Sequence, residues 1–221
     1  MNKKRMLNVD DAYAVKTIDD VVRLYGEWAE DYDEDLVKDT GYVVHLRVAE
    51  LWIRQRSLIN GAVLDVGCGT GIVGEALRER GIEVIDGIDI SPEMLAQACK
   101  KKTKDGLSVY RQLIQADLTK KLDIPDSQYA GLISAGTFTH AHLGPDPLDE
   151  LWRVAASGAC CAIGVRSTHF ESTDFGEKLS NDAANGTITK PEFVEVNVYS
   201  EPTRDWEHAD DKYLIVLCRV V

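Results

Sequence analysis

The sequence predicts an α/β fold in which a mostly parallel sheet is covered by helices on both faces. From residue 62 onward, short apolar runs rich in β-branched residues alternate with segments of helical periodicity, which is the pattern of βαβ units. The runs are apolar at consecutive positions, as expected for strands that are buried on both faces. The chain has 221 residues, enough for one domain with a large core.

Two amphipathic helices are expected before the sheet. Thr17, followed by Asp20, is a capping-box-like start for the first of them. The second is expected within 42–59, where apolar residues again recur at helical spacing. One face of the first helix carries residues at positions i, i+4, i+7 and i+11, namely Val21, Tyr25, Trp28 and Tyr32.

The alternating part of the chain predicts five strands and three helices. Strands are expected within 62–67, 83–91, 108–118, 129–138 and 158–166. Helices are expected within 71–81, 91–102 and 146–156. Two of these helices have an N-cap residue followed by proline, at Ser91-Pro92 and Asp146-Pro147.

The C-terminal part of the chain breaks this alternation. Two apolar runs, 193–200 and 213–221, are separated by a polar loop into which no helix fits, so the two strands should pair antiparallel. The segment 171–190 is rich in turn-forming residues and favours turns. We expect residues 1–41 to form an N-terminal helical lid segment and residues 42–221 to form the main domain.

The composition disfavours a nucleic-acid partner. Acidic residues outnumber basic ones 37 to 25, giving a formal net charge of −12, whereas a phosphate backbone is bound by clustered Lys and Arg. The one compact basic run, at 100–104, is expected to be the exposed end of a helix.

The N-terminus and the cysteines suggest a reduced, cytoplasmic location with no membrane partner. Residues 1–13 include basic residues but no apolar h-region, so no secretory signal is expected, and no apolar stretch is long enough to span a membrane. The cysteines form no C-x-x-C pair, and no disulfide framework is expected. They are Cys68, Cys99, Cys160, Cys161 and Cys218.

The stretch VLDVGCGTGIVGEAL, residues 63–77, contains two overlapping glycine motifs. Gly69, Gly71 and Gly74 spell G-x-G-x-x-G, the dinucleotide fingerprint. Read from Asp65, the same stretch spells D-x-G-x-G-x-G, with glycines at 67, 69 and 71. Both interpretations place a ligand-binding loop between a buried strand and a helix N-terminus.

Carboxylates at three successive strand ends distinguish the two interpretations. Asp65 is expected to point toward the ligand crevice, where it would repel a pyrophosphate and attract an ammonium or sulfonium. Asp89 fits a ribose diol in either case, and Asp117 can accept the amino protons of an adenine. Together they favour a zwitterionic ligand with an adenosine and a cationic centre, such as S-adenosylmethionine.

Three motifs, in this order and spacing, resemble those of class I S-adenosylmethionine-dependent methyltransferases. They are VLDVGCGTG (63–71), GIDISPEML (87–95) and QADL (115–118). The resemblance covers residues 42–221, and it implies a Rossmann-like seven-stranded sheet of order 3-2-1-4-5-7-6 with the last strand antiparallel. The preceding YGEWAEDYDED (25–35) is similar to the Williams–Beuren-region methyltransferase-like family and related small-molecule methyltransferases.

The resemblance also implies roles for individual residues. Asp65 and the glycine loop would hold the methionine portion of the cofactor, and Asp89 the ribose hydroxyls. Ile90 and Met94 would enclose the adenine, while Asp117 and the Leu118 amide would read its edge. The loop positions concerned are Gly67, Cys68, Gly69, Thr70 and Gly71.

Further candidates lie in the lid segment and after the fourth strand. Trp28 and Tyr32 belong to a stripe that is more often core than site, but as lid residues they would gain cation–π attraction to a sulfonium. His140 and His142 are candidates for a general base or a substrate contact. H-x-H lacks a third ligand, so no metal site is expected. Arg166, Tyr199 and Trp206 lie near later strand ends and can line a pocket, although the sequence does not show that they do.

The predicted function is therefore methyl transfer from S-adenosylmethionine to a small-molecule acceptor by in-line displacement, with a protein side chain as second choice. Residues 134–138 read SAGTF, so the N-P-P-Y type of amide-methylating motif is absent after the fourth strand. Two alternatives from other classes remain. One is a non-catalytic S-adenosylmethionine-binding interaction protein, and the other is a nicotinamide-dependent oxidoreductase.

Overall fold

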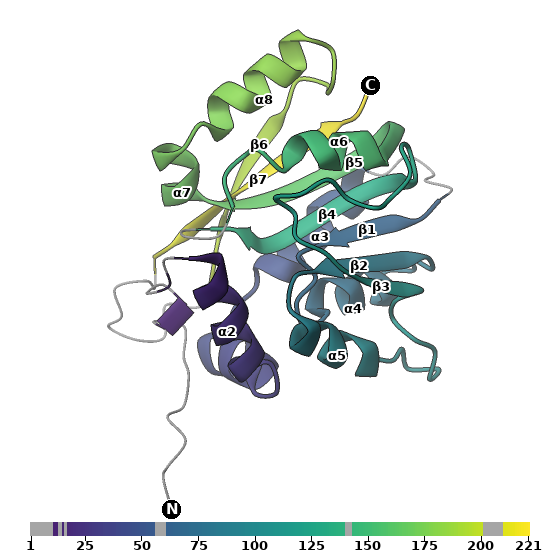
Figure 1. Cartoon of the computed structure of the whole chain (residues 1–221), viewed down its shortest axis with the longest axis vertical. Coiled ribbons are helices and arrows are strands. Elements are labelled where there is room, and N and C mark those ends of the chain that lie inside the picture. The colour runs from purple at the N-terminus through teal and green to yellow at the C-terminus, as the bar shows by residue number, and fades with distance from the viewer. Residues whose placement is uncertain (1–10, 13–14, 16, 56–60, 140–142, 201–209) are drawn as a thin grey trace, which may run out of the picture.

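A seven-stranded sheet forms the centre of the computed structural model, which describes residues 11–12, 15, 17–55, 61–139, 143–200 and 210–221 (Figure 1). The strand order is β3-β2-β1-β4-β5-β7-β6. The strands are β1 (Val63–Val66), β2 (Ile85–Asp89), β3 (Gln112–Gln115), β4 (Tyr129–Phe138), β5 (Ala155–Arg166), β6 (Glu192–Asn197) and β7 (Lys212–Arg219).

The strand directions confirm the predicted topology. Strands β1 to β5 run parallel to one another. Each connection between them is a helix or a long crossover, as parallel pairing requires. Strand β7 pairs antiparallel with both β5 and β6, as the predicted C-terminal hairpin requires. The carboxyl ends of β1, β2, β3 and β4 therefore meet along one edge of the sheet, where ligands bind in open α/β folds.

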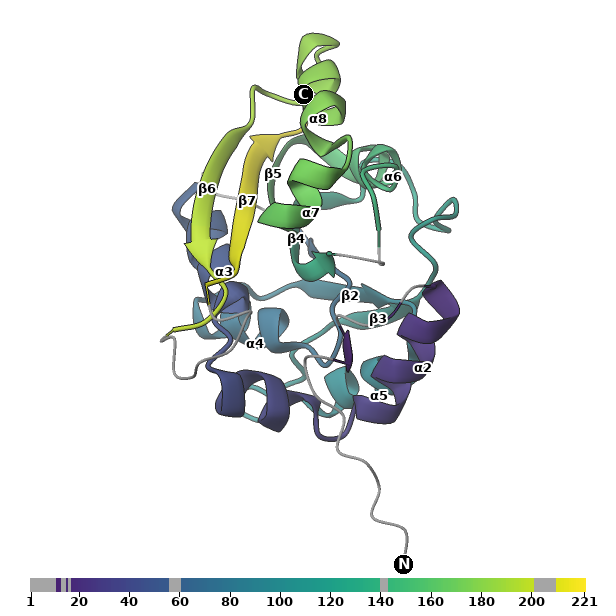
Figure 2. The same cartoon turned by 90° about the vertical axis from the view of Figure 1, so that its left-hand side faces the viewer.

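Helices cover both faces of the sheet, and Figure 2 shows α3 and α6 on opposite sides of β4 and β5. They are α2 (Ile18–Trp28), a π-helix η1 (Asp33–Lys38), α3 (Val44–Gln55), α4 (Ile72–Glu79), α5 (Pro92–Lys100), α6 (Leu148–Val154), α7 (Ser167–Ser172) and α8 (Phe175–Ala184). Trp52 of α3 is fully buried against Gly131 of β4, and its Nε1 donates to the Cys160 carbonyl at 2.8 Å. Leu151 of α6 and Phe175 of α8 belong to the core on the other face.

The N-terminal helix α2 begins as the sequence predicts. Thr17 is its N-cap, and its Oγ1 accepts a hydrogen bond from the Asp20 backbone N–H at 3.1 Å. The helix lies beside α5, near the carboxyl ends of the strands (Figure 1). Trp28 and Leu36 of this region are buried in the same core cluster as residues of α3, α4 and α5, so α2 and η1 pack against the helices that cover the sheet.

Two local predictions were wrong. The segment 171–190, expected to form turns, contains α8, because Phe175 and Leu179 lie four residues apart on one helical face and are buried against α6 and the sheet. Asp146 is not the N-cap of α6. The Leu148 backbone N–H bonds to the Pro145 carbonyl, and this turn delays the start of the helix to Leu148.

Candidate functional site

A cleft opens at the carboxyl ends of β1 to β4 and is covered on one side by α2. We call it the strand-end cleft. It contains about 840 Å³ of empty space, part of it open to solvent, which is the size of a small-molecule site. Its walls come from α2, the glycine loop and the four strand ends: Val21, Val22, Tyr25, Tyr32, Gly67, Gly69, Asp89, Ile90, Ser91, Met94, Ala116, Asp117, Leu118, Ala135, Gly136, Thr137 and Leu143.

The glycine loop after β1 leaves room for a ligand at Gly69. This residue has a φ of +52°, a left-handed conformation that favours glycine, and a Cβ added to it would meet no atom within 4 Å. Its backbone N–H donates to Asp89 Oδ2 at 2.8 Å. A ligand can therefore approach the Gly69 backbone from the cleft while Asp89 holds the loop from the side.

Asp89 connects the glycine loop to the start of α5. Its second oxygen, Oδ1, accepts from the Ser91 backbone N–H at 2.9 Å. Burial raises the pKa of this carboxyl, while the N–H groups of Ser91 and Gly69 lower it. Each carboxylate oxygen has a second lone pair, so Asp89 can accept further hydrogen bonds from a ligand in the cleft.

The far end of the cleft has apolar walls and one carboxylate. Ile90 and Met94 line it beyond β2, and Leu118 lines it beyond β3. Asp117 Oδ1 accepts from the Thr119 N–H at 2.8 Å and from the Thr119 hydroxyl at 2.7 Å, which fixes the orientation of the carboxylate. A flat, apolar group with polar edges matches this end of the cleft.

Asp65 does not point toward the cleft as the sequence predicted. Its side chain is fully buried beneath the glycine loop, where Oδ2 accepts a hydrogen bond from the Tyr110 hydroxyl at 2.6 Å. Oδ1 is buried without a hydrogen-bond partner among the described residues. Burial raises the pKa of Asp65 to about 7, the Tyr110 hydrogen bond opposes this shift, and the charge of Asp89 adds to it.

Tyr110 also explains Gly74, the third glycine of the dinucleotide-like motif. A Cβ at position 74 would lie 2.4 Å from the Tyr110 ring and hydroxyl. This glycine is therefore needed for packing against Tyr110 beneath the loop, which accounts for the G-x-G-x-x-G spacing without a bound pyrophosphate. The position of Tyr110 before β3 carried no signal in the sequence.

Other predicted loop residues lie outside the walls of the strand-end cleft. The Cys68 side chain is buried, and its sulfur would lie 2.8 Å from a Cβ added at Gly87 of β2. Gly71 precedes α4 and would meet the Tyr110 ring if it had a side chain. Thr70 is buried, and its hydroxyl donates to Asp33 Oδ1 of η1.

The bond from Thr70 to Asp33 belongs to a polar cluster that joins the lid segment to the main domain. We call it the lid latch, and it consists of Asp33, Thr70, Glu75 and Lys101. The Lys101 ammonium donates to Asp33 Oδ2 at 2.7 Å and also to Glu75 of α4. The Lys101 side chain is only 15% exposed, so solvent screens these charges less than those of surface pairs. Asp33 thus links η1 to Thr70 of the glycine loop and to Lys101 at the end of α5, which in turn contacts Glu75 of α4.

A second cavity lies next to the strand-end cleft. We call it the aromatic pocket, and it contains about 520 Å³ of empty space, part of it open to solvent. Tyr25, Tyr32 and Gly136 line both cavities. The walls of the aromatic pocket are Ala12, Tyr25, Trp28, Tyr32, Leu36, Tyr42, Gly136, Thr139, Arg166, Val198, Tyr199 and Tyr213.

The aromatic stripe predicted on α2 is divided between these two cavities. Tyr32 lines both the strand-end cleft and the aromatic pocket. Trp28 does not line this cleft. It is buried, forms part of the aromatic pocket and donates from Nε1 to Asp35 Oδ2 at 2.8 Å. Its ring meets that of Tyr32 edge-on, with centroids 4.9 Å apart.

The two candidate histidines, His140 and His142, lie outside the described residues, as does Trp206. Leu143, which follows the histidines, lines the strand-end cleft. Within the described part of the chain, no three His, Cys, Asp or Glu side chains come together as a metal site requires. Among the described helices, none combines the length and apolar character of a membrane span.

Residues 63–158 match the family described as a methyltransferase domain. The chain is 27% identical over 152 residues to human Methyltransferase-like protein 27, covering 68% of this chain and 60% of that protein. It is 44% identical over 73 residues to Ubiquinone biosynthesis O-methyltransferase of Pseudomonas syringae pv. tomato, covering 32% of this chain and 31% of the relative. A Saccharomyces cerevisiae 18S rRNA (guanine(1575)-N(7))-methyltransferase is 37% identical over 81 residues, covering 34% and 29%.

The chain thus spans less than two thirds of the length of each of these relatives. Among solved structures, the crystal structure of the [4+2]-cyclase SpnF has a TM-score of 0.64 at 19% identity, covering 93% of this chain and 97% of that one. At this identity the likeness concerns the fold, and it supports the Rossmann-like architecture seen in the sheet order.

Proposed function

Because the chain belongs to the class I S-adenosylmethionine-dependent methyltransferase family, we propose that it transfers a methyl group from S-adenosylmethionine to a small-molecule acceptor. One observation carries this proposal. The strand-end cleft, with Asp89 and an open glycine loop, shares two tyrosines with a separate aromatic pocket. A cofactor and an acceptor can therefore bind side by side, separated only by the shared wall.

The residues of the strand-end cleft fit S-adenosylmethionine. Asp89 has acceptor capacity left for a ribose diol after its two backbone hydrogen bonds. Ile90 and Met94 offer apolar surface to an adenine, and Asp117 with the Leu118 amide would read its edge. Asp65, buried beneath the loop with its pKa raised to about 7, lines no part of the cleft, so the fit to the cofactor rests on Asp89 and the far end of the cleft.

When bound, S-adenosylmethionine supplies a methyl group that is already activated on a sulfonium, so the chain has to position the acceptor and exclude water. Tyr25 and Tyr32 line both cavities, and a sulfonium placed over an aromatic face would gain roughly 0.5–2 kcal/mol. In the transfer, the acceptor atom forms the new bond to carbon while the bond from carbon to sulfur breaks, and sulfur keeps the electron pair.

An acceptor such as a phenol or an amine must also lose a proton. Burial raises the pKa of both Tyr25 and Tyr32, so these phenols are neutral at pH 7 and do not act as bases. Burial lowers the pKa of His45 to about 4, so this ring is neutral at pH 7. His45 stacks on Tyr42 and lines neither cavity, so we do not assign it as the base. His140 and His142, which follow β4, are our proposal for the base.

The choice of a small molecule rests on the aromatic pocket and on charge. One relative is named for ubiquinone biosynthesis and another for 18S rRNA, and each matches about a third of this chain. The net charge of −12 disfavours RNA, and the aromatic pocket has the volume of a small-molecule site.

The test begins with calorimetric titration of the full chain with S-adenosylhomocysteine and, separately, with NADH. We expect binding of S-adenosylhomocysteine only, and tight NADH binding without it would contradict the proposal. A transfer screen with labelled methyl then compares a metabolite extract, a protein extract and total RNA. We expect label in the metabolite fraction. Binding without transfer to any fraction would instead indicate a non-catalytic S-adenosylmethionine-binding protein.

We also propose that the lid latch slows the release of the cofactor. The Lys101→Met variant should release S-adenosylhomocysteine about fivefold faster, because a partly buried ion pair of ~1 kcal/mol holding η1 to the loop helix is lost. Stopped-flow displacement measures this rate. Lys100→Met is the matched control, since the neighbouring Lys100 is exposed and bonds only to Gln97 among the contacts seen. Equal release rates in the two variants would contradict a role for the latch.

A further inference from the structure

The aromatic pocket has walls suited to a flat ring. Five tyrosines and one tryptophan line it, while the aliphatic wall residues are Ala12, Leu36 and Val198. Aromatic side chains of this kind prefer stacked or edge-to-face contacts with another ring. The ring of Tyr42 stacks on that of His45, which is not part of the pocket wall, with centroids 5.7 Å apart. This contact holds the Tyr42 ring in place.

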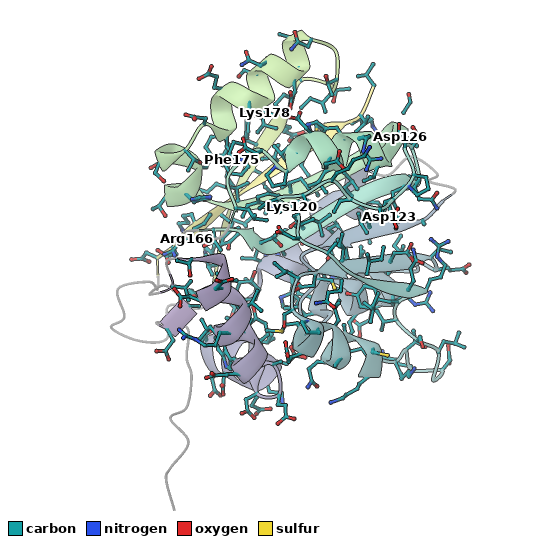
Figure 3. The ribbon with its side chains drawn as sticks, viewed as in Figure 1. Lys120, Asp123, Asp126, Arg166, Phe175 and Lys178 are labelled. Carbon is teal, nitrogen blue, oxygen red and sulfur yellow. The ribbon has the colours of Figure 1, made fainter. Side chains whose placement is uncertain are left out.

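Arg166 is the single residue with a formal charge among the described residues that line the aromatic pocket. It ends β5, at the same end of the sheet as α2 (Figure 3), and its side chain is 6% exposed. Its guanidinium forms an ion pair with Asp211, which is not part of the pocket wall. A guanidinium carries five N–H donors in a planar fork and can serve a second anion beside Asp211.

The surrounding strands hold Arg166 in place. Arg166 and Tyr213 are direct partners across the β5–β7 ladder, so their side chains lie side by side on one face of the sheet. The Thr139 side chain forms a hydrogen bond with Tyr213. Burial raises the pKa of Tyr213, while the nearby positive charge of Arg166 lowers it.

The opposite wall comes from the link between the lid segment and the C-terminal hairpin. Tyr42 and Tyr199 form an antiparallel bridge, flanked by hydrogen bonds from the Val43 N–H to the Val198 carbonyl at 2.9 Å and from the Ser200 N–H to the Gly41 carbonyl at 2.9 Å. This backbone pairing fixes the positions of Tyr42 and Tyr199, two residues of the pocket wall. Such a preformed site favours a rigid ligand.

Arg166 lines the aromatic pocket but not the strand-end cleft, whereas Tyr25 and Tyr32 line both. A ligand whose anionic group contacts Arg166 would thus extend its other end toward the shared tyrosines and the cofactor. We propose that the aromatic pocket binds an aromatic carboxylate, with its ring between the tyrosines and its carboxylate on the Arg166 guanidinium. This inference rests on the proposed function, since the bound molecule would be the methyl acceptor.

A cationic ligand is the main competitor, because aromatic cages also bind ammonium groups. The ion pair with Asp211 balances the charge of Arg166, so the distinction rests on hydrogen bonding. The guanidinium has only N–H donors, which can contact a carboxylate but offer no acceptor to an ammonium. The tyrosines are neutral at pH 7, since burial raises the pKa of Tyr25, Tyr32, Tyr42 and Tyr213, so they add no negative charge that would hold a cation.

The test uses three probes of the same shape and different charge: 3,4-dihydroxybenzoate, 3,4-dihydroxybenzamide and 3,4-dihydroxybenzylamine. Each is titrated calorimetrically into the full chain saturated with S-adenosylhomocysteine. We expect the carboxylate to bind at least about tenfold more tightly than the amide, because it forms charge-assisted hydrogen bonds to Arg166, and the amine to bind most weakly. Equal affinity for acid and amide, or tightest binding of the amine, would overturn the proposal.

Arg166→Met should abolish the preference for the carboxylate over the amide while leaving amide affinity within about twofold. Arg166→Lys retains the charge beside Asp211 but lacks the planar fork, so the preference should fall only in part. Arg219→Met is the matched control, because Arg219 lies on β7 outside the pocket and bonds to the Gly158 carbonyl. A preference that survives in Arg166→Met would show that another group holds the anion.

The affinity for S-adenosylhomocysteine, measured first for every variant, reports the folded state and separates the two proposals. If wild-type protein binds S-adenosylhomocysteine but none of the three probes, the inference about the aromatic pocket fails and the proposed function stands. If wild-type protein does not bind S-adenosylhomocysteine, the proposed function itself fails. Should Arg166→Met fail to fold, the three probes on the wild type and on Arg166→Lys still decide.

Discussion

Replacing Asp89 with alanine should weaken S-adenosylhomocysteine binding by about two orders of magnitude while the chain stays folded. Asp89 is the carboxylate at the strand-end cleft that would accept the ribose hydroxyls, and hydrogen bonds to a charged group contribute roughly 1.5–3 kcal/mol each. The substitution also removes the acceptor of the Gly69 and Ser91 N–H groups, so the loop loses its lateral support. Calorimetry measures the affinity, and circular dichroism the fold.

Two further variants separate the causes of this loss. Asp105→Ala removes an exposed acidic residue after α5 and should leave the affinity unchanged, which controls for net charge. Asp89→Asn keeps one acceptor oxygen but turns an amide toward one of the two N–H groups, so it should recover only part of the affinity. Unchanged affinity in Asp89→Ala would remove the ribose contact from the proposed site.

The second large effect concerns stability at Asp65. Its folded pKa of about 7 lies above the ordinary value of 3.8, so the folded state binds the proton more tightly than the unfolded chain does. The contribution of Asp65 to stability is therefore most favourable below pH 4 and is lost as the pH rises from about 4 to 7. Above pH 7 the buried charge costs on the order of 4 kcal/mol.

Asp65→Asn should accordingly raise the free energy of unfolding at pH 8, by about 1–3 kcal/mol after the cost of a buried amide, and have no such benefit at pH 4. Urea unfolding at both pH values measures this difference. Asp86→Asn is the matched control on β2. Asp86 is also fully buried, but it accepts from Arg111, Gln112 and Tyr129, so its loss should destabilise the fold at pH 8. Equal effects of the two substitutions would contradict the account of Asp65.

The sequence was most informative where neighbouring residues determine the structure. Buried strands, the Thr17 and Ser91 caps and the positions of Asp89 and Asp117 at strand ends all follow from local patterns. The orientation of Asp65 was not predictable, because it depends on Tyr110, 45 residues further along the chain. The Tyr110 hydroxyl donates a hydrogen bond to the Asp65 carboxylate beneath the loop.

Two other features depended on contacts that no short window contains. The composition of 171–190 favours turns, but the Trp152 indole donates to Asp182 at 2.9 Å and Phe175 is buried, so tertiary packing stabilises a helix there. The lid latch joins Asp33 to Thr70, and neither residue belongs to a motif that pairs them. The spacing of Trp28 and Tyr32 predicted one aromatic face, yet it did not show that two cavities would share it.

Tyr25 of α2 and Tyr32, which precedes η1, line both cavities, and this shared wall has a kinetic consequence. A displacement of residues 25–32 would widen both cavities at once, so the release of one occupant would be coupled to the release of the other. Turnover in such an arrangement favours a compulsory order, in which the donor enters a vacant enzyme first, the acceptor follows, and the spent donor leaves last.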